Sequence, residues 1–369
     1  MSSNVRAYNK ASLFLLLLFT FVFSAGNLHA DYKWNLPPGL PEPVIPQSNP
    51  MSVAKVELGR HLFYYKKLSL NGKMACATCH RQARAFTDGR VTAQGTTGEI
   101  HPRNTPSLGN VAYQPVLTWA QPKLTRLEEQ LLIPLLGTQP VELGMAGKKK
   151  IIVRRLKRDP AYHSMFQAAF GDNKAVSLEN MAKALASFQR RLITANSAYD
   201  REDLSLAAER GAKLFFGERL NCFRCHPAPF FTDSLTHVGL GFKEIAFHNT
   251  GLYNLAGKGA YPPKNTGLHA HTGQPEDMGR FRTPSLRNVA VTAPYMHDGS
   301  VPTLAQVIDI YAAGGRGSGR SNPHKSVFVS GFNLTSIEKS DLIAFLTSLT
   351  DETFLTDPRF SDPFTNPLK

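Results

Sequence analysis

Two short stretches decide how this chain folds: Cys76-Ala-Thr-Cys-His80 and Cys222-Phe-Arg-Cys-His226, which together hold all four cysteines of its 369 residues. Cysteine pairs in an exported chain ordinarily indicate disulfides, and a zinc site is a second alternative. A histidine directly after each pair is instead typical of c-type haem attachment, in which two thiols form thioethers to the porphyrin and the histidine binds iron. The sequence therefore predicts two covalently bound c-type haems.

The N-terminus predicts export. Arg6 and Lys10 precede an apolar run from Ala11 to Ala25, and Leu28-His29-Ala30 offers a cleavage site with small residues. We expect residues 1–30 to be a signal peptide and the mature protein to lie in the periplasm. The run is short for a membrane-spanning helix, and no later stretch approaches the ~18 apolar residues needed, so no stable membrane insertion is expected.

Composition and charge bound the class of protein. The chain is 42% hydrophobic and 19% charged, as in ordinary globular proteins, and its formal net charge is +14. Nucleic acid is not an expected partner in the periplasm, whereas a basic surface can steer an acidic protein partner or electron donor. The cations from Lys148 to Arg158 form one candidate patch, and a solvated helix face is the other interpretation.

The chain contains the same unit twice. Three blocks recur in the same order around the two haem motifs, which indicates a duplicated domain. The first members of the pairs are Glu57-Leu-Gly-Arg-His-Leu-Phe, Ala85-Phe-Thr-Asp and Thr105-Pro-Ser-Leu-Gly-Asn-Val-Ala; the second are Glu209-Arg-Gly-Ala-Lys-Leu-Phe, Phe230-Phe-Thr-Asp and Thr283-Pro-Ser-Leu-Arg-Asn-Val-Ala. We expect an N-terminal haem domain over residues 31–200 and a C-terminal haem domain over residues 201–369.

The two copies differ by an insertion. The first cysteine and the Thr-Pro-Ser-Leu block lie 29 residues apart in copy one (76 to 105) and 61 apart in copy two (222 to 283). The extra segment, His248 to Arg280, is rich in Gly, His and Pro and predicts a long loop. Its His269 and His271 are either metal ligands or solvated loop residues.

Apolar residues at helical spacing predict that the rest is mainly α-helical, with long loops packed around haem. The expected helices run from Leu124 to Leu136, Ile151 to Phe170, Leu178 to Leu192 and Ile337 to Leu349. Thr335 and Glu338 form a capping-box pattern at the start of the last one.

These residues resemble a known family, the bacterial dihaem cytochrome c peroxidases, and in particular its MauG-like branch. The resemblance covers essentially the whole mature chain. It runs through Leu58-Gly-Arg-His-Leu-Phe, both haem motifs, Leu127-Glu-Glu-Gln, Pro140-Val-Glu-Leu-Gly, and Arg282-Thr-Pro-Ser-Leu-Arg-Asn-Val-Ala to Pro294-Tyr-Met-His-Asp-Gly-Ser. It implies a haem-dependent enzyme that uses hydrogen peroxide.

The resemblance also separates the two branches at one position. The peroxidases have a methionine that binds the second iron fourteen residues after the histidine of His-Asp-Gly, and MauG-like enzymes have a tyrosine there. Counted from His297, that residue is Tyr311, which the pattern alone would place in a helical core. A phenolate favours oxidised iron, so Tyr311 as a haem ligand suits the storage of an oxidising equivalent.

For the first haem, the resemblance implies an iron with an open sixth position. Many peroxidases carry a blocking histidine sixteen residues beyond the motif, where this chain has Thr96; His101 is an alternative ligand. By resemblance, Glu142 moves the proton that peroxide cleavage requires, Gln130 lies beside it, and Pro134 bounds the pocket. Without the family Glu142 and Gln130 would pass for surface residues, and the spacing from Pro134 to Glu142 is two residues longer than in better-known members.

Two further sites follow from the resemblance. Trp119 aligns with the aromatic that connects the two haems, although it would serve equally as a core residue. Asn104, Thr292 and Pro294 align with the ligands of a calcium ion between the haem domains, through one side chain and two backbone carbonyls. The pattern alone would make Asn104 a turn residue.

Three functions compete at this stage. The first is a MauG-like oxidase that forms high-valent haem iron with peroxide and oxidises an aromatic side chain of a partner protein. The opening Tyr32-Lys-Trp-Asn-Leu-Pro-Pro-Gly is similar to the methanobactin-operon group MbnH, whose members modify a tryptophan of a periplasmic copper-binding protein. The second is a peroxidase that takes electrons from a small c-type cytochrome or copper protein, and the third is a non-catalytic dihaem electron carrier.

Overall fold

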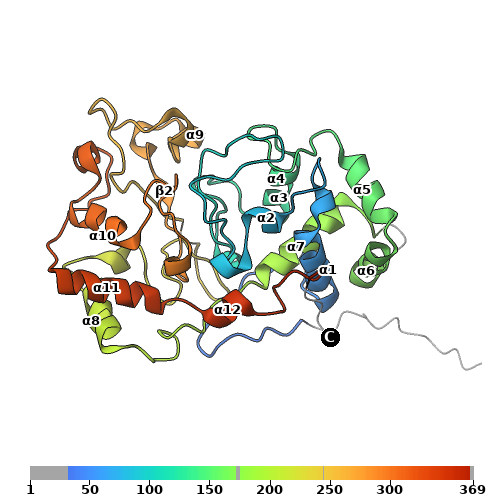
Figure 1. Ribbon diagram of the computed structural model, residues 1–369, viewed down its shortest axis with the longest axis horizontal. Helices are drawn as coiled ribbons and strands as arrows, with labels where there is room; N and C mark the ends of the chain where they lie inside the picture. Colours follow the sequence, from blue (N-terminus) through green and yellow to red (C-terminus); the bar gives the residue numbers. More distant parts are fainter. Residues whose placement is uncertain (1–31, 172–174, 244, 366–369) are drawn as a thin grey trace, which may run out of the picture.

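The computed structural model describes residues 32–171, 175–243 and 245–365, so the predicted signal peptide lies outside the described residues. The fold is mainly α, as expected, with a two-stranded antiparallel pair, β1 (Phe247–His248) and β2 (Phe281–Arg282). The two halves lie side by side, with the N-terminal half on the right of Figure 1. Within the described ranges, no helix is long and apolar enough to cross a membrane.

Each half is built on one crossing of two long helices (Figure 1). In the first half α1 (Val53–Tyr64) packs on α7 (Leu178–Arg190), and in the second α8 (Leu206–Phe215) packs on α11 (Ser336–Ser348). Serine caps both opening helices, because Ser52 accepts a hydrogen bond from the amide of Lys55 and Ser205 from that of Ala208. The predicted capping box at the start of α11 is confirmed.

The repeated glycine explains why these helices cross so closely. A Cβ on Gly59 would lie 2.0 Å from the carbonyl oxygen of Ala184, and one on Gly211 would lie 2.0 Å from that of Asp341. Only glycine permits such an approach of two backbones. The repeated block before each haem motif is therefore a helix-packing signal.

The shorter helices depart from the expected boundaries. The segment predicted as one helix from Ile151 to Phe170 is two helices, because Pro160 cannot donate a backbone hydrogen bond within a continuing helix and Asp159 caps the second one. The segment from Leu124 is likewise two short helices. The bounds are α2 (Cys76–Cys79), α3 (Leu127–Gln130), α4 (Leu132–Leu136), α5 (Lys149–Lys157), α6 (Pro160–Phe170), α9 (His269–Thr272), α10 (Leu304–Ala312) and α12 (Glu352–Thr356).

The chain returns to the first half at its end. Phe354 and Phe360 of the α12 region belong to the core of the first half, where Phe354 packs on Phe86 with ring centroids 5.5 Å apart. The side-chain amide of Gln82, through Nε2, donates to the backbone carbonyl of Asp357 at 2.8 Å. Residues after 350 therefore stabilise the first half, while the expected boundary near residue 200 stays a prediction.

A separate cluster of buried side chains joins the halves. Trp119 of the first half packs with Leu252, Tyr261 and Phe281, which lie in or next to the insertion of the second. The insertion is thus not a bare loop, because β1, α9 and β2 give it structure and its side chains close the space between the two copies.

Candidate functional site

The first haem motif presents an oriented histidine. Cys76 and Cys79 begin and end α2, and His80 follows directly. Nδ1 of His80 lies 2.7 Å from the carbonyl oxygen of Phe86. That hydrogen bond fixes Nδ1 as the protonated nitrogen and leaves Nε2 as the atom that binds a metal. Burial also lowers the pKa of His80, which favours the neutral ring that ligation needs.

The second motif repeats this geometry. Nδ1 of His226 lies 2.9 Å from the carbonyl oxygen of Phe231. In each copy the serine of Thr-Pro-Ser-Leu donates to the turn that holds the histidine: Ser107 Oγ to the carbonyl of Ala85, and Ser285 Oγ to that of Phe230, both at 2.6 Å. The repeated blocks therefore hold the histidine in place, although they lie far apart in the sequence.

The four cysteines form no disulfide. Burial raises the pKa of Cys76 and of Cys222 to about 12 each, so both are neutral thiols. A zinc site would need thiolates, whereas Cys76 and Cys222 are neutral thiols; only Cys225 has further candidate ligands beside it among the described residues, Asp233 and His248. Two neutral thiols followed directly by an oriented histidine in each motif fit thioether attachment of haem.

The second motif opens into a cavity with apolar walls, as haem requires. His226, Cys222 and Cys225 line it together with Tyr311, which lies near the end of α10. Burial, and secondarily the neighbouring cysteines, raises the pKa of the Tyr311 hydroxyl. Among the other lining side chains are Phe215, Leu220, Leu286, Val289, Ile308, Leu342 and Leu346.

Near the first motif, backbone pairing brings two of the expected residues together. The amide of Leu143 donates to the carbonyl of Pro134 at 2.8 Å, so Glu142 lies beside Pro134. The amide of Thr96 donates to the carbonyl of Glu142 at 2.7 Å. Gln130 ends α3 and is half-buried.

Glu142 is set up to exchange a proton near neutral pH. Burial raises its pKa to about 7. Its charge raises the pKa values of both Cys76 and Cys79, so the carboxyl group faces the haem motif. Oε1 lies 3.9 Å from Nε2 of His101. The sequence suggested His101 only as an alternative iron ligand, and its contact with Glu142 was not predicted.

The expected bridge and calcium residues meet at the same cavity. Trp119, Asn104, Thr292 and Pro294 all line it. The indole Nε1 of Trp119 donates to the carbonyl of Asn104 at 2.7 Å. The amide nitrogen of Asn104 donates to the carbonyl of Arg90 at 2.8 Å, which leaves its side-chain oxygen for a cation.

Other charged residues have plainer roles. Ile152 and Leu156 of α5 are buried while Lys149 and Lys150 are exposed, as a solvated helix face requires. His271 in the insertion is exposed and lies 3.3 Å from the side chain of Gln121.

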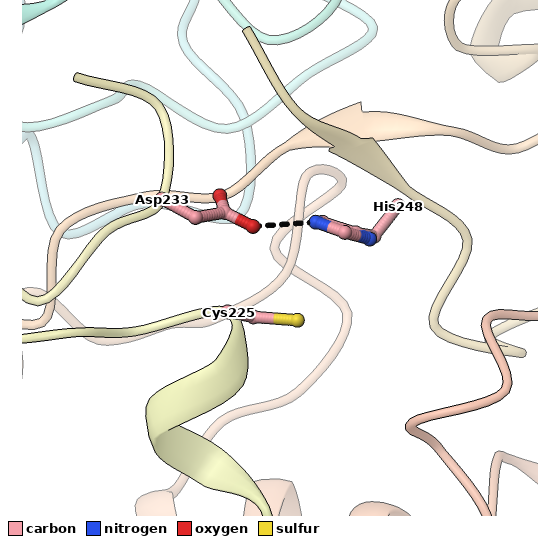
Figure 2. Close-up of side chains that lie close together, drawn as sticks. All are labelled: Cys225, Asp233 and His248. Atoms are coloured by element: carbon pink, nitrogen blue, oxygen red, sulfur yellow. Dashed lines mark hydrogen bonds and ion pairs between the residues drawn. The ribbon is translucent and has the colours of Figure 1, made fainter. Parts of the chain in front are cut away.

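Sequence reasoning missed two arrangements of charge. Asp233 and His248 form a hydrogen bond beside Cys225 (Figure 2). Asp233 had a signal, the repeated Phe-Thr-Asp, whereas nothing in the pattern distinguished His248. Glu128, within the Leu-Glu-Glu-Gln stretch, is buried in a bidentate ion pair with Arg190.

Two attachment motifs with oriented histidines, each in its own helical half, define a dihaem c-type cytochrome. A family model described as di-haem cytochrome c peroxidase matches residues 53–204, and one described as RoxA-like, cytochrome c-like matches residues 280–312. The chain belongs to the di-haem cytochrome c peroxidase family, in its MauG-like branch, and is a haem oxidoreductase. Membership of this family therefore favours an enzyme over a non-catalytic electron carrier.

The relatives agree on this placement. The methylamine utilization protein MauG of Methylophilus methylotrophus is 34% identical, over 88% of this chain and 90% of MauG. The cytochrome-c peroxidase IdrP1 of Pseudomonas sp. (strain SCT) is 34% identical over 97% of both chains. The crystal structure of a MauG-like protein associated with microbial copper homeostasis is 47% identical, with a TM-score of 0.88, over 90% of this chain and 99% of the other.

Proposed function

We propose that this protein is a periplasmic dihaem oxidase that uses hydrogen peroxide to oxidise a tryptophan side chain of a partner protein. The observation that carries the proposal is the position of Tyr311, which lines the same cavity as His226. Two protein ligands would close the second iron, and the first would remain open for peroxide. The two haems would then have unequal roles despite their duplicated attachment sites.

In this proposal Cys76, Cys79 and His80 hold the reactive haem, and Cys222, Cys225 and His226 hold the other. Each haem supplies an iron that takes up and releases oxidising equivalents. Glu142 is the proton-transfer residue: its carboxylate accepts the proton from one peroxide oxygen and returns it to the departing oxygen. Its pKa of about 7 suits both halves of that task.

The remaining site residues support this scheme. Pro134 bounds the space beside Glu142, and Gln130 orients peroxide from the end of α3. Tyr311 would hold the second iron as a phenolate, and binding of the anion by the metal would offset the raised pKa of its buried hydroxyl. A phenolate stabilises oxidised iron, whereas a thioether would stabilise reduced iron.

Trp119 is proposed to carry electrons between the haems. It lies in the buried cluster that joins the two halves, and it lines the cavity of the second haem. A calcium ion bound by the side chain of Asn104 and the carbonyls of Thr292 and Pro294 would fix this region, since the carbonyl of Asn104 also accepts the indole hydrogen bond.

The partner is proposed to be a periplasmic copper-binding protein, and residues 1–30 the signal for export. The 47% identity to a MauG-like protein associated with copper homeostasis supports this choice. The reaction balances when the partner's indole gives up two electrons and two protons, and hydrogen peroxide takes them to form two waters.

A second candidate is a peroxidase that receives electrons from a small c-type cytochrome or copper protein. The 34% identity to the peroxidase IdrP1 favours it, and a chain with a net charge of +14 suits an acidic donor. Tyr311 argues against it, because a high-potential electron reservoir is better served by a thioether ligand.

The test adds one equivalent of peroxide to the fully oxidised holoprotein and compares Tyr311→Phe, Tyr311→Met and Tyr295→Phe. Tyr295 is the matched control, since it lines the same cavity but its hydroxyl donates to the carbonyl of Val289. The unaltered protein and the control should react without prior reduction and oxidise the partner, as read by mass spectrometry of its tryptophan peptides. Tyr311→Phe should lose partner oxidation.

Two results would contradict the proposal. One is a first haem that reacts with peroxide only after one-electron reduction. The other is steady-state turnover with a reduced small cytochrome that is unchanged between the unaltered protein and Tyr311→Met. Either would favour the peroxidase alternative.

A further inference from the structure

A charged pair lies against the second haem motif and has no part in the function proposed above. Nε2 of His248 lies 2.6 Å from Oδ2 of Asp233. Their ligand atoms and the sulfur of Cys225 all lie within 4.8 Å of one another. Figure 2 shows His248 on strand β1 and Asp233 on the loop after Cys225, pointing toward each other above the sulfur.

The pair is held firmly. The backbone amide of Asp233 donates to the carbonyl of Cys225 at 2.9 Å, which ties the carboxylate to the haem motif. The side chains of His248 and Asp233 are only 24% and 12% exposed. His248 belongs to the β1–β2 pair, where it faces Phe281. A partly buried ion pair of this kind is only weakly screened by salt.

The three residues have the geometry of a metal site, but haem attachment removes that possibility. Once the sulfur of Cys225 is a thioether it is no longer a thiolate ligand, and only two donors remain. The arrangement is therefore an ion pair beside the haem edge. The hydrogen bond to Asp233 is the largest of the effects that raise the pKa of His248, and this 2.6 Å pairing favours the charged imidazole.

The duplicated copy provides an internal comparison. Asp88 occupies the position of Asp233 in the repeated Phe-Thr-Asp block, and its charge raises the pKa of Cys79, so it also lies beside a haem motif. Oδ1 of Asp88 accepts a hydrogen bond from the amide of Arg90, and Oδ2 is buried without a partner among the described residues. Copy one thus has the carboxylate without a hydrogen-bonded histidine among the described residues, although the charge of Asp88 raises the pKa of His101 against the larger effect of burial.

We propose that His248 is a positioning residue that sets the reduction potential of the second haem by neutralising Asp233. The carboxylate stabilises the oxidised haem, which carries one more positive charge than the reduced haem. His248 removes most of this effect in copy two, while Asp88 keeps it in copy one. The insertion therefore makes the two haems electrostatically unequal, through a residue that the shorter loop of copy one does not contain.

The positive charge of Arg282 does not replace that of His248. Arg282 is buried next to β1, and this burial lowers its pKa to about 10 against the smaller, opposite effect of Asp233. Its guanidinium donates to the carbonyls of Thr118 and Thr283. His248 forms the hydrogen bond to Oδ2 of Asp233. Removal of the imidazole therefore leaves that oxygen without its counter-charge.

The experiment is a potentiometric titration of the holoprotein, in which the signals of the two haems are followed separately by electron paramagnetic resonance. His248→Gln keeps a hydrogen-bond donor but removes the charge. We expect the ratio of ferrous to ferric second haem at a fixed potential to fall on the order of tenfold, as for one unit charge roughly 10 Å away at an effective dielectric constant near 20. A tenfold change corresponds to about 59 mV for one electron.

Three further variants make the test specific. Asp233→Asn with His248→Gln should restore the original ratio, because the charge to be neutralised is gone. Asp88→Asn should raise the ferrous fraction of the first haem, because Asp88 forms no ion pair among the described residues. His271→Gln, an exposed histidine of the same insertion, should change neither haem. Haem content is measured first, so that a variant that fails to mature is recognised.

The proposal is overturned if His248→Gln leaves the potential of the second haem equal to that of the His271→Gln control, or raises it. It is also overturned if the double variant shifts as much as His248→Gln alone, since the loss would then be structural. The inference needs only haem attachment at Cys225. Failure of the oxidase proposal, which concerns Tyr311 and the partner, would leave these outcomes intact.

Discussion

Replacing Glu142 with glutamine removes a carboxyl group near the first haem motif whose pKa burial raises to about 7. Glutamine has nearly the same shape, so the pairing of Leu143 with Pro134 and of Thr96 with Glu142, which uses backbone atoms, should persist. What is lost is the ability to accept a proton from peroxide and return it. Proton transfer by a positioned side chain typically contributes about 10²- to 10⁴-fold to a rate. We expect the second-order rate constant for peroxide to fall within that range.

The pH dependence follows from the raised pKa. Burial favours the neutral carboxyl, so a pKa of about 7 leaves it about half ionised at pH 7, about one tenth at pH 6 and about one hundredth at pH 5. The reaction needs the ionised form as the initial base. The rate constant of the unaltered protein should therefore drop about fivefold from pH 7 to 6 and about tenfold more to pH 5, and level off above pH 8.

The assay is stopped-flow mixing of the oxidised holoprotein with excess peroxide, followed in the Soret band from pH 5 to 9. Glu142→Gln should be slow and nearly independent of pH. Glu129→Gln, an exposed residue of α3 that is 57% accessible, is the matched control and should keep the profile of the unaltered protein. The reasoning is refuted if Glu142→Gln retains the acidic limb near pH 7, or if its rate lies within about threefold of the control.

Four other expectations can be checked with the same protein. Trp119→Phe should leave the rate of peroxide consumption unchanged but lower partner oxidation at least about tenfold, measured by mass spectrometry, because the link between the halves is weakened. His101→Ala should leave the high-spin signal of the first haem intact in electron paramagnetic resonance; conversion of a low-spin signal would instead identify His101 as a ligand. Chelation of calcium should lower the thermal midpoint and perturb the second haem spectrum, and Asn104→Ala should mimic it. Glu128→Gln should lower the free energy of unfolding by about 3–5 kcal/mol in denaturant titrations, because Arg190 is left buried without its counter-charge.

The sequence predicted those features that local chemistry or repetition specifies. The Cys-x-x-Cys-His motifs indicated haem because the chemistry needs adjacent residues, and the repeated blocks revealed two copies without any structure. The repeated glycine and serine proved to act in the same way in both copies, at the helix crossing and at the histidine turn. Because the glycine and the serine have the same role in both copies, each occurs twice at matching positions of the sequence.

Features that depend on long-range packing were missed or came only from the family resemblance. Nothing in the pattern brings Glu142 to His101, because they meet through loops that are separated by two short helices. The helix predicted over Ile151 to Phe170 was wrong at Pro160, where periodicity continued across a residue that cannot continue a helix. Periodicity reports which face is buried, and it does not report what the backbone can do at one position.

The insertion shows most clearly why duplication alone does not explain this protein. Both copies orient their histidine through the same carbonyl and brace the same turn with a serine, so attachment itself cannot distinguish the haems. The two haem sites differ in the side chains that segments outside the repeated blocks place next to each motif. Copy one receives Glu142 from a loop before α5, and copy two receives Tyr311 from α10 and His248 from the start of the insertion. The same strand pair that carries His248 also receives Trp119, since the amide of Arg282 donates to its carbonyl at 2.8 Å. The insertion therefore holds His248 beside the second haem motif and packs Leu252 and Tyr261 with Trp119, so changes to this segment should alter the potential and the coupling of the haems together.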